Sequence, residues 1–157
     1  MKIGIALMAL AGCVMPMAAS QTLVADRLTQ SQLIEQAQLL SAKAQGPSGT
    51  ASARLSEYPN HYTMVALRHK DGGAEIHANF ADFFLVVQGN ATLVTGGSVA
   101  DGKEVSPGEI RGTFVRNGTS MTLNPGDVVH IPATVPHQML VPNGSTFIYF
   151  VIKVKEK

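Results

Sequence analysis

Cysteine is nearly absent from this sequence. The 157 residues include a single Cys, Cys13, which lies close to the start of the chain. A chain that loses this start has no thiol, so it forms neither disulfides nor thiolate–metal bonds. Any metal must then be held by nitrogen and oxygen ligands, and stability must come from the core. Hydrophobic residues make up 45% of the chain, which is enough material for one folded domain.

Charge is also scarce, and neither sign dominates. Charged residues make up 15% of the chain, with 12 Lys and Arg against 11 Asp and Glu. The composition is that of a globular rather than a disordered protein. The basic residues form no run or patch, so we expect no nucleic-acid partner.

The first 20 residues have the pattern of an export signal. Lys2 supplies a positive start, residues 3–19 carry no charge, and small residues precede Gln21. This pattern predicts a signal peptide over residues 1–20, cleaved after Ala19 or Ser20. The alternative is a membrane anchor, but the apolar run is short for a span of about 20 residues and contains Pro16. We therefore expect a periplasmic or secreted protein.

A second interpretation of this segment stays open. Residues 10–13 read Leu-Ala-Gly-Cys, which resembles the bacterial lipoprotein box. In that case Cys13 would be acylated after cleavage, and the protein would be a lipoprotein anchored at this residue. Membrane contact is expected only under this interpretation.

The rest of the chain divides into a short helical part and a long β part. Apolar residues recur at roughly helical spacing over 22–44, which predicts a helix. Residues 45–50 (Gln-Gly-Pro-Ser-Gly-Thr) are helix breakers. The expected parts are therefore the signal peptide 1–20, an N-terminal helix and linker 21–51, and a β domain 52–157.

From residue 52 onward the apolar pattern changes to a period of two. Asn-Gly, Asp-Gly and similar turn signals separate short stretches rich in β-branched and aromatic residues. The predicted strands are 52–58, 61–69, 74–78, 81–88, 90–95, 110–115, 119–123, 127–131, 136–141 and 146–154. No helical stretch separates them, so the pattern predicts an all-β fold, an antiparallel sandwich or barrel.

Two histidines lie in contexts that favour metal binding. Glu75 and His77 are two residues apart on one predicted strand, so their side chains point to the same face about 7 Å apart. Asp82, on the next strand, can return to the same place. His137 follows a proline-containing corner, and only a folded barrel brings it alongside. Two imidazoles with one or two carboxylates form a nitrogen and oxygen site for a divalent first-row metal.

The segments around these residues resemble the two cupin motifs. Gly126, Pro132 and His137 match the second motif, G-x5-P-x-G-x2-H, with Thr134 in place of its second Gly. The first motif, H-x-H-x4-E-x6-G, is matched more loosely over residues 75–89. Glu75 stands at its first His, His77 at its second, Asp82 at its Glu and Gly89 at its Gly.

The resemblance implies a cupin-type antiparallel β-barrel (double-stranded β-helix, or jelly roll) with a metal at the centre of its mouth. The ligand positions of the family fall on Glu75, His77, Asp82 and His137. Asp is one methylene shorter than Glu, so Asp82 is either a fourth ligand or falls short of the metal. The expected ion is iron, manganese or zinc. The alternative is a metal-free barrel in which these groups bond to one another.

Two functions remain open at this level. One is a metal-dependent enzyme that acts on a small oxygen-rich molecule such as a sugar acid or a hydroxy-carbonyl compound. The other is a non-catalytic barrel that binds a small ligand. Strand parity alone does not decide whether Tyr58, Tyr62, Arg68 or Arg111 faces the pocket. An inward Arg111 would bind a substrate carboxylate, whereas an outward one is solvated. Small cupins are often dimers, so a homodimer is one assembly that the resemblance allows.

Overall fold

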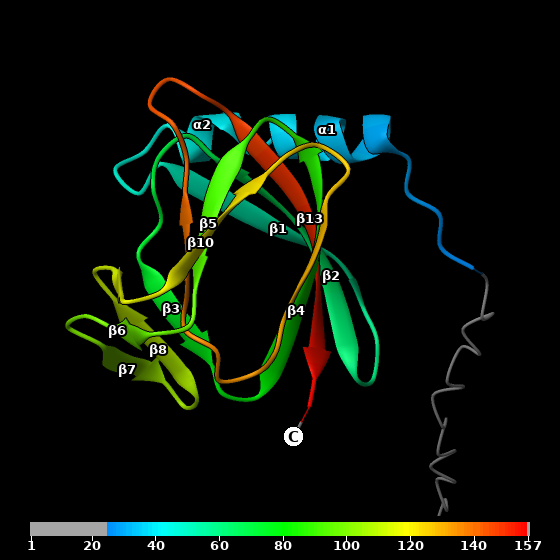
Figure 1. The fold of residues 1–157 in the computed structure, drawn as a ribbon. Coiled ribbons are helices and arrows are strands. Elements are labelled where there is room, and N and C mark those ends of the chain that lie inside the picture. The colour runs from blue at the N-terminus through cyan, green and yellow to red at the C-terminus, as the bar shows by residue number, and fades with distance from the viewer. Residues whose placement is uncertain (1–24, 157) are drawn as a thin grey trace, which may run out of the picture.

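Two antiparallel sheets face each other across the core. The computed structural model describes residues 25–156, and Figure 1 shows its sheets with both helices at one end. The first sheet contains, in spatial order, β1 (Thr50–Glu57), β2 (His61–Arg68), β13 (Phe147–Lys155), β4 (Phe80–Gln88) and β11 (Val128–Ile131). The second contains β10 (Thr119–Leu123), β5 (Ala91–Thr95), β12 (His137–Leu140), β3 (Ala74–His77), β8 (Glu109–Gly112) and β7 (Lys103–Ser106). The short strands β6 (Ser98–Val99) and β9 (Val115–Arg116) pair beside them.

Alternation along the strands of the first sheet separates two apolar layers. In β2, Met64 and Ala66 belong to the layer between the sheets, whereas Val65 and Leu67 belong to the layer on the outer face. The inner layer also takes aromatic residues from β4 and β13. Because neighbouring residues of a strand point to opposite faces, one strand serves both layers.

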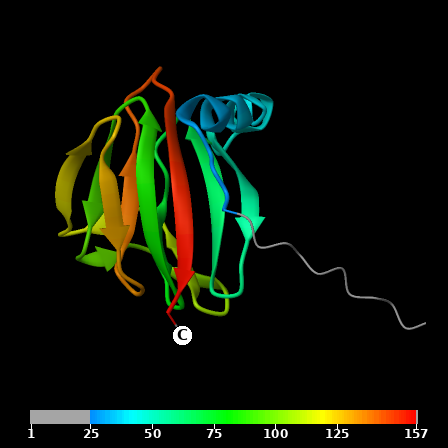
Figure 2. The same cartoon turned by 90° about the vertical axis from the view of Figure 1, so that its right-hand side faces the viewer.

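The outer layer is covered by α1 (Gln30–Gln38) and α2 (Ser41–Ala44), seen at the end of the five-stranded sheet in Figure 2. Leu33 and Ala37 of α1 are buried there. The predicted helix 22–44 is too long, because described residues 25–29 are not helical and the helix breaks after Gln38. Thr29 explains the late start: it caps α1 and forms a reciprocal capping box with Gln32.

The strand prediction is confirmed for most of the barrel. The predicted strand 110–115 is wrong in one respect, because the structure divides it into β8 and β9. The predictions also missed β6 and β7. Both are short, and the residues of β7 are all exposed, so neither shows an apolar alternation.

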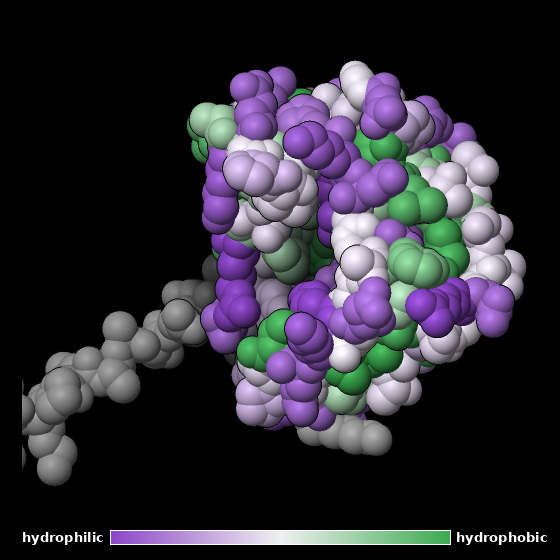
Figure 3. Space-filling model, turned by 90° about the vertical axis from the view of Figure 1, so that its left-hand side faces the viewer, coloured by the Kyte–Doolittle hydropathy of each residue, from purple (hydrophilic) through white to green (hydrophobic). Residues whose placement is uncertain are grey.

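The expected signal peptide 1–20 and Cys13 lie outside the described residues. Neither of the two helices in the described part, residues 25–156, is long and apolar enough to cross a membrane. Figure 3 shows that the face on the left of Figure 1 is hollowed, with hydrophilic residues around the rim.

Candidate metal centre

Three polar side chains converge on the inner side of the second sheet. Glu75 and His77 lie on β3 and point to the same face, as the strand period requires. His137 begins β12 and stands directly opposite Glu75 in the β3–β12 register. The antiparallel pairing therefore brings together residues that are 62 positions apart in the chain.

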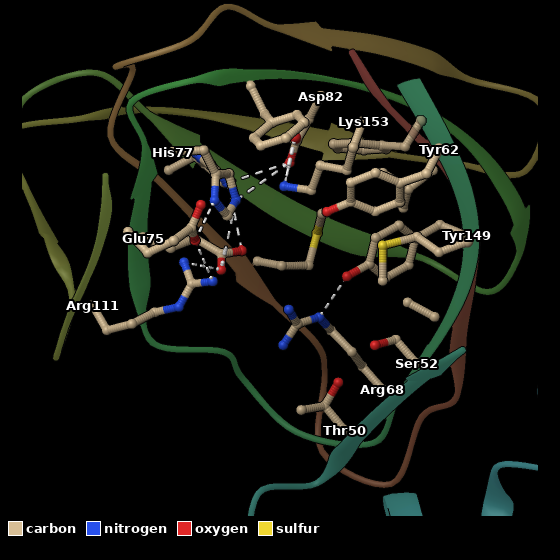
Figure 4. Close-up of a pocket in the computed structure, with 18 residues that line it drawn as sticks. Thr50, Ser52, Tyr62, Arg68, Glu75, His77, Asp82, Arg111, Tyr149 and Lys153 are labelled. Carbon is tan, nitrogen blue, oxygen red and sulfur yellow. Dashed lines mark hydrogen bonds and ion pairs between the residues drawn. The ribbon is translucent and has the colours of Figure 1, made fainter. Parts of the chain in front are cut away.

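These three residues are close enough to share one ion. One ligand atom from each lies within 4.8 Å of the others. The Nε2 atom of His137 is 3.4 Å from Oε1 of Glu75, and Nε2 of His77 is 3.9 Å from Oε2 of the same carboxylate. Figure 4 shows both side chains of β3 turned into the pocket.

Hydrogen bonds on the far side of each imidazole fix its orientation. The Nδ1 atom of His77 lies 2.7 Å from Oε2 of Glu109, and Nδ1 of His137 lies 3.0 Å from the carbonyl oxygen of Val135. Each acceptor requires Nδ1 to carry a proton, so in the neutral imidazole each Nε2 presents a lone pair to the centre. This carboxylate or carbonyl contact behind a histidine is typical of metal ligands.

The two Nε2 atoms also lack the partners that buried polar atoms normally have. Both are buried, and neither has a hydrogen-bond partner among residues 25–156. Buried polar atoms without a partner are uncommon and need an explanation. A divalent cation would satisfy both lone pairs at once, so the donor set of Glu75, His77 and His137 fits the metal that the sequence predicts.

Charge in the centre favours an ionised Glu75. Burial alone would raise the pKa of this carboxyl. The imidazole of His137 and the guanidinium of Arg111 outweigh burial and hold the pKa well below its ordinary value. Arg111 does point inward, but it lies 2.6 Å from Glu75 and 3.0 Å from Glu109. Its guanidinium is therefore engaged by two carboxylates of the protein itself.

Asp82 enters the same space from the opposite sheet. Its Oδ2 atom lies 3.6 Å from Nε2 of His77 and 3.8 Å from Nε2 of His137. Both of its oxygens, however, lie 2.6 Å from the ammonium group of Lys153 on the neighbouring strand β13. The Lys153 ammonium would therefore compete with a metal ion for this carboxylate, and direct ligation by Asp82 stays a prediction.

Lys153 is the functional residue that the sequence interpretation missed. It lies in the apolar run of β13 with only 8% of its surface exposed. A Lys at an inward position of such a strand is rarely buried without a partner. Its place within an apolar run is therefore the feature of the sequence that could have predicted a buried ion pair. Burial and the Lys153 ammonium lower the pKa of His77, which keeps that imidazole neutral and able to bind a metal.

The remaining histidines stay away from the centre. His130 is exposed and stacks on Phe83, with ring centroids 4.1 Å apart. His69 contacts Thr146, and His61 contacts Asn60. Among the described residues, these three histidines belong to no cluster of metal-ligating side chains.

The corner before His137 contains a strained residue. Thr134 has a φ of 70°, a conformation that is rare for a β-branched residue. It stands where the second cupin motif has Gly, which adopts this conformation without strain. The Thr134 amide donates to the carbonyl oxygen of His77 at 2.8 Å, so the corner is bonded directly to the metal-centre strand.

The centre opens into a cavity of about 300 Å³ between the sheets. Apolar side chains from both sheets line part of this cavity, among them Met64, Phe84, Met139 and Val151. Tyr62, Arg68 and Tyr149 line the same cavity from the five-stranded sheet (Figure 4).

The comparisons with known proteins concern the fold of this chain. No family model matches the sequence, and no curated protein sequence matches it. Among solved structures, the DMSP lyase DddQ from Ruegeria pomeroyi matches with a TM-score of 0.50 and 16% identity, over 68% of this chain and 47% of the lyase. An uncharacterised protein with a double-stranded β-helix domain from Klebsiella pneumoniae matches with a TM-score of 0.50 and 16% identity, over 68% of this chain and 72% of that protein. An oxalate oxidase in complex with glycolate matches with a TM-score of 0.52 and 16% identity, over 73% of this chain and 55% of the oxidase.

The chain has the cupin fold. The all-β prediction is therefore confirmed, together with the double-stranded β-helix arrangement and the N-terminal helix. The chain spans about half the length of the lyase and the oxidase that it matches. At 16% identity these likenesses concern the fold, and the candidate metal centre rests on the geometry of this chain.

Proposed function

We propose that this protein binds one divalent metal ion through Glu75, His77 and His137. The observation that carries the proposal is the pair of buried imidazole Nε2 atoms that face the same carboxylate and have no hydrogen-bond partner among residues 25–156. Iron, manganese and zinc all suit two imidazoles and a carboxylate.

We further propose that the metal-bound barrel is an enzyme that acts on a small oxygen-rich molecule, such as a sugar acid or a hydroxy-carbonyl compound. When bound, the ion would polarise an oxygen of the substrate as a Lewis acid. The chain supplies a cavity of about 300 Å³, which suits a small molecule. Its apolar wall, which includes Phe84 and Val151, would exclude water around the reacting group. The oxalate oxidase complex, with its glycolate, shows a small hydroxy acid bound to a protein that shares this fold.

Export also belongs to the proposal. The charged start, the apolar run and the small residues of 1–20 support removal of this segment, with the protein working in the periplasm or outside the cell. Intact-mass analysis of protein from the native host tests this. A mass that still includes residues 1–20 overturns it, and a lipid adduct on Cys13 selects the lipoprotein.

Metal analysis tests the binding proposal. Protein stripped by a chelator and reloaded with Zn²⁺, Mn²⁺ or Fe²⁺ should contain one ion per chain by elemental analysis. At a metal concentration a hundredfold above Kd, the fold gains about 2.7 kcal/mol, so the melting temperature should rise. The double variant His77→Ala/His137→Ala should lose both effects. His130→Ala is the matched control, because this exposed imidazole lies outside the centre, and it should retain them.

A parent protein that binds no metal would overturn the proposal and favour the metal-free barrel. Activity is tested separately, by incubating the loaded protein with sugar acids and hydroxy acids and following their masses. Conversion that depends on the metal supports the enzyme. Binding without conversion of any compound supports the alternative, a non-catalytic ligand-binding barrel.

A further inference from the structure

Arg68 is the cation of the cavity that the metal proposal leaves unexplained. It is the last residue of β2, on the same inward face as Met64 and Ala66. In Figure 4 its guanidinium reaches into the pocket, and its dashed line runs to Tyr149 and not to Glu75. It therefore faces the space that a bound molecule would fill.

Its hydrogen bonding differs from that of two other arginines of the barrel. Arg111 pairs with two carboxylates, and Arg54 lies 2.7 Å from Glu57. No carboxylate of residues 25–156 forms an ion pair with Arg68. Its Nε donates a hydrogen bond to the phenol oxygen of Tyr149 at 3.0 Å. A guanidinium has five N–H donors, so most of its capacity is unused by the described protein.

The backbone at Gly72 leaves the space that the guanidinium of Arg68 occupies. A Cβ atom at Gly72 would lie 2.6 Å from Nη1 of Arg68. Gly72 itself is held on both sides, because its amide donates to the carbonyl oxygen of Met139 at 2.7 Å and its own carbonyl accepts from Gln138 at 2.8 Å. The absence of a side chain at this position therefore gives the guanidinium its room.

Two hydroxyl side chains lie beside Arg68 in the cavity wall. Thr50 stands opposite Arg68 in the β1–β2 register, and Thr50 and Ser52 both line the cavity. The same cavity is lined by the apolar side chains of Met64 and Met139 and by Glu75 and the two imidazoles. The cavity thus has a cationic donor at one place and a candidate metal centre at another.

We infer that Arg68, with the Ser52 hydroxyl in the same wall, forms an anion subsite that binds the carboxylate of a small organic acid lodged in the barrel. The Thr50 hydroxyl donates to the carbonyl oxygen of Leu67 and only borders the subsite. A planar guanidinium with free donors pairs with a carboxylate through two parallel hydrogen bonds. An acid held at Arg68 extends along the apolar wall toward the metal centre. The inference narrows the substrate class of the proposed function, on which it rests, to organic acids with a carboxylate separate from the reacting oxygen atoms.

Calorimetric titration with dicarboxylates tests the subsite. The probes are malonate, succinate, glutarate and adipate, because one end of each can pair with Arg68 while the length varies, and glutaramide is the uncharged control. At least one dicarboxylate should bind the metal-loaded parent. Arg68→Gln should weaken that binding by roughly 10- to 100-fold, the range expected for a lost charge-assisted pair. Arg116→Gln, at an exposed arginine that does not line the cavity, should leave it unchanged.

Gly72→Ala keeps the positive charge and tests the same site independently. Its methyl group would displace the guanidinium, so acid binding should weaken although Arg68 is present. Circular dichroism and metal analysis accompany each variant, and both Arg68→Gln and Gly72→Ala should fold and retain one metal per chain.

The outcomes separate this inference from the proposed function. A parent that binds metal but none of the acids, or that binds them equally well after Arg68→Gln, overturns the subsite and leaves the metal proposal intact. Equal binding of glutaramide also overturns it. Acid binding that depends on Arg68 in a parent without metal supports the subsite and contradicts the metal proposal.

Discussion

The two sheets contribute opposite chemistry to one cavity. The six-stranded sheet supplies Glu75, His77 and His137, whose inward atoms can take a cation. The five-stranded sheet supplies two cations, Lys153 and Arg68. Lys153 is neutralised within its own sheet by Asp82, whereas Arg68 has no carboxylate partner in the described chain. The comparison shows that two cations on the inner face of one sheet differ in function. A neighbouring carboxylate neutralises Lys153, whereas Arg68 keeps hydrogen-bond donors available for a ligand.

The largest expected effect comes from breaking the Lys153–Asp82 pair. Lys153→Met leaves a buried carboxylate without its cation, so the metal-free protein should lose about 3–5 kcal/mol of unfolding free energy in chemical denaturation. The double variant Lys153→Met/Asp82→Leu should regain most of this loss, because no buried charge is left. Lys155→Met, two residues along β13 and exposed, is the control. A loss below about 1 kcal/mol for Lys153→Met would show that the pair is not a structural element of the five-stranded sheet.

Asp82→Asn tests whether Asp82 is a ligand of the metal centre or only the partner of Lys153. If Asp82 stays with Lys153 and only orients the centre, metal affinity should fall by roughly 10- to 100-fold while one ion per chain still binds. Competition with a chelator of known affinity measures this. A loss as complete as that of the double histidine variant would instead make Asp82 a fourth ligand.

Lowering the pH should reduce the stability of the metal-free protein through the residues that the six-stranded sheet contributes to the site. The folded-state pKa of His77 lies below that of an unfolded His, which is about 6.5. The unfolded chain therefore binds the proton more readily, so stability is full above about pH 6.5 and falls as the pH drops toward the folded-state pKa. Glu75, whose pKa is also lowered, adds a loss at still lower pH. Melting temperatures from pH 8 to pH 5 measure the trend, and His77→Gln should flatten it. A parent profile that is already flat contradicts the assignment.

The smallest expected effect concerns the corner before His137. Thr134→Gly relieves a left-handed conformation that costs roughly 1–2 kcal/mol in a residue with a side chain, but it also makes the unfolded chain more flexible. We expect a net gain of up to about 1 kcal/mol in unfolding free energy, with metal binding retained. Gly126→Ala is the matched opposite, because Gly126 has a φ of 94° and open space around it, and should destabilise the fold. A clear loss of stability in Thr134→Gly would show that the side chain at position 134 is needed.

Much of this arrangement follows from the sequence because it depends on local periodicity. The spacing of Glu75 and His77 places both on one face of β3, and turn residues mark most strand ends. The helix boundary was not predictable from apolar spacing, because the capping box at Thr29, rather than the apolar pattern, determines where α1 begins.

The partners of the site residues could not be predicted, since they depend on register between distant strands. Lys153 meets Asp82 because β13 and β4 pair with these residues opposite each other. Arg111 meets Glu75 for the same reason, in the pairing of β3 with β8. Strand parity gives the face of a residue, but only register gives its neighbour, and the neighbour decides which charges remain available.

Anomalous diffraction from crystals of the manganese- or zinc-loaded protein tests the central claim most directly. The account predicts one strong peak per chain at the metal absorption edge, about 2.0–2.2 Å from Nε2 of His77, Nε2 of His137 and a carboxylate oxygen of Glu75. The Arg111 guanidinium should remain beside Glu109. No peak between the two imidazoles, or a peak bound by other residues, would contradict the assignment of this cluster as the metal centre.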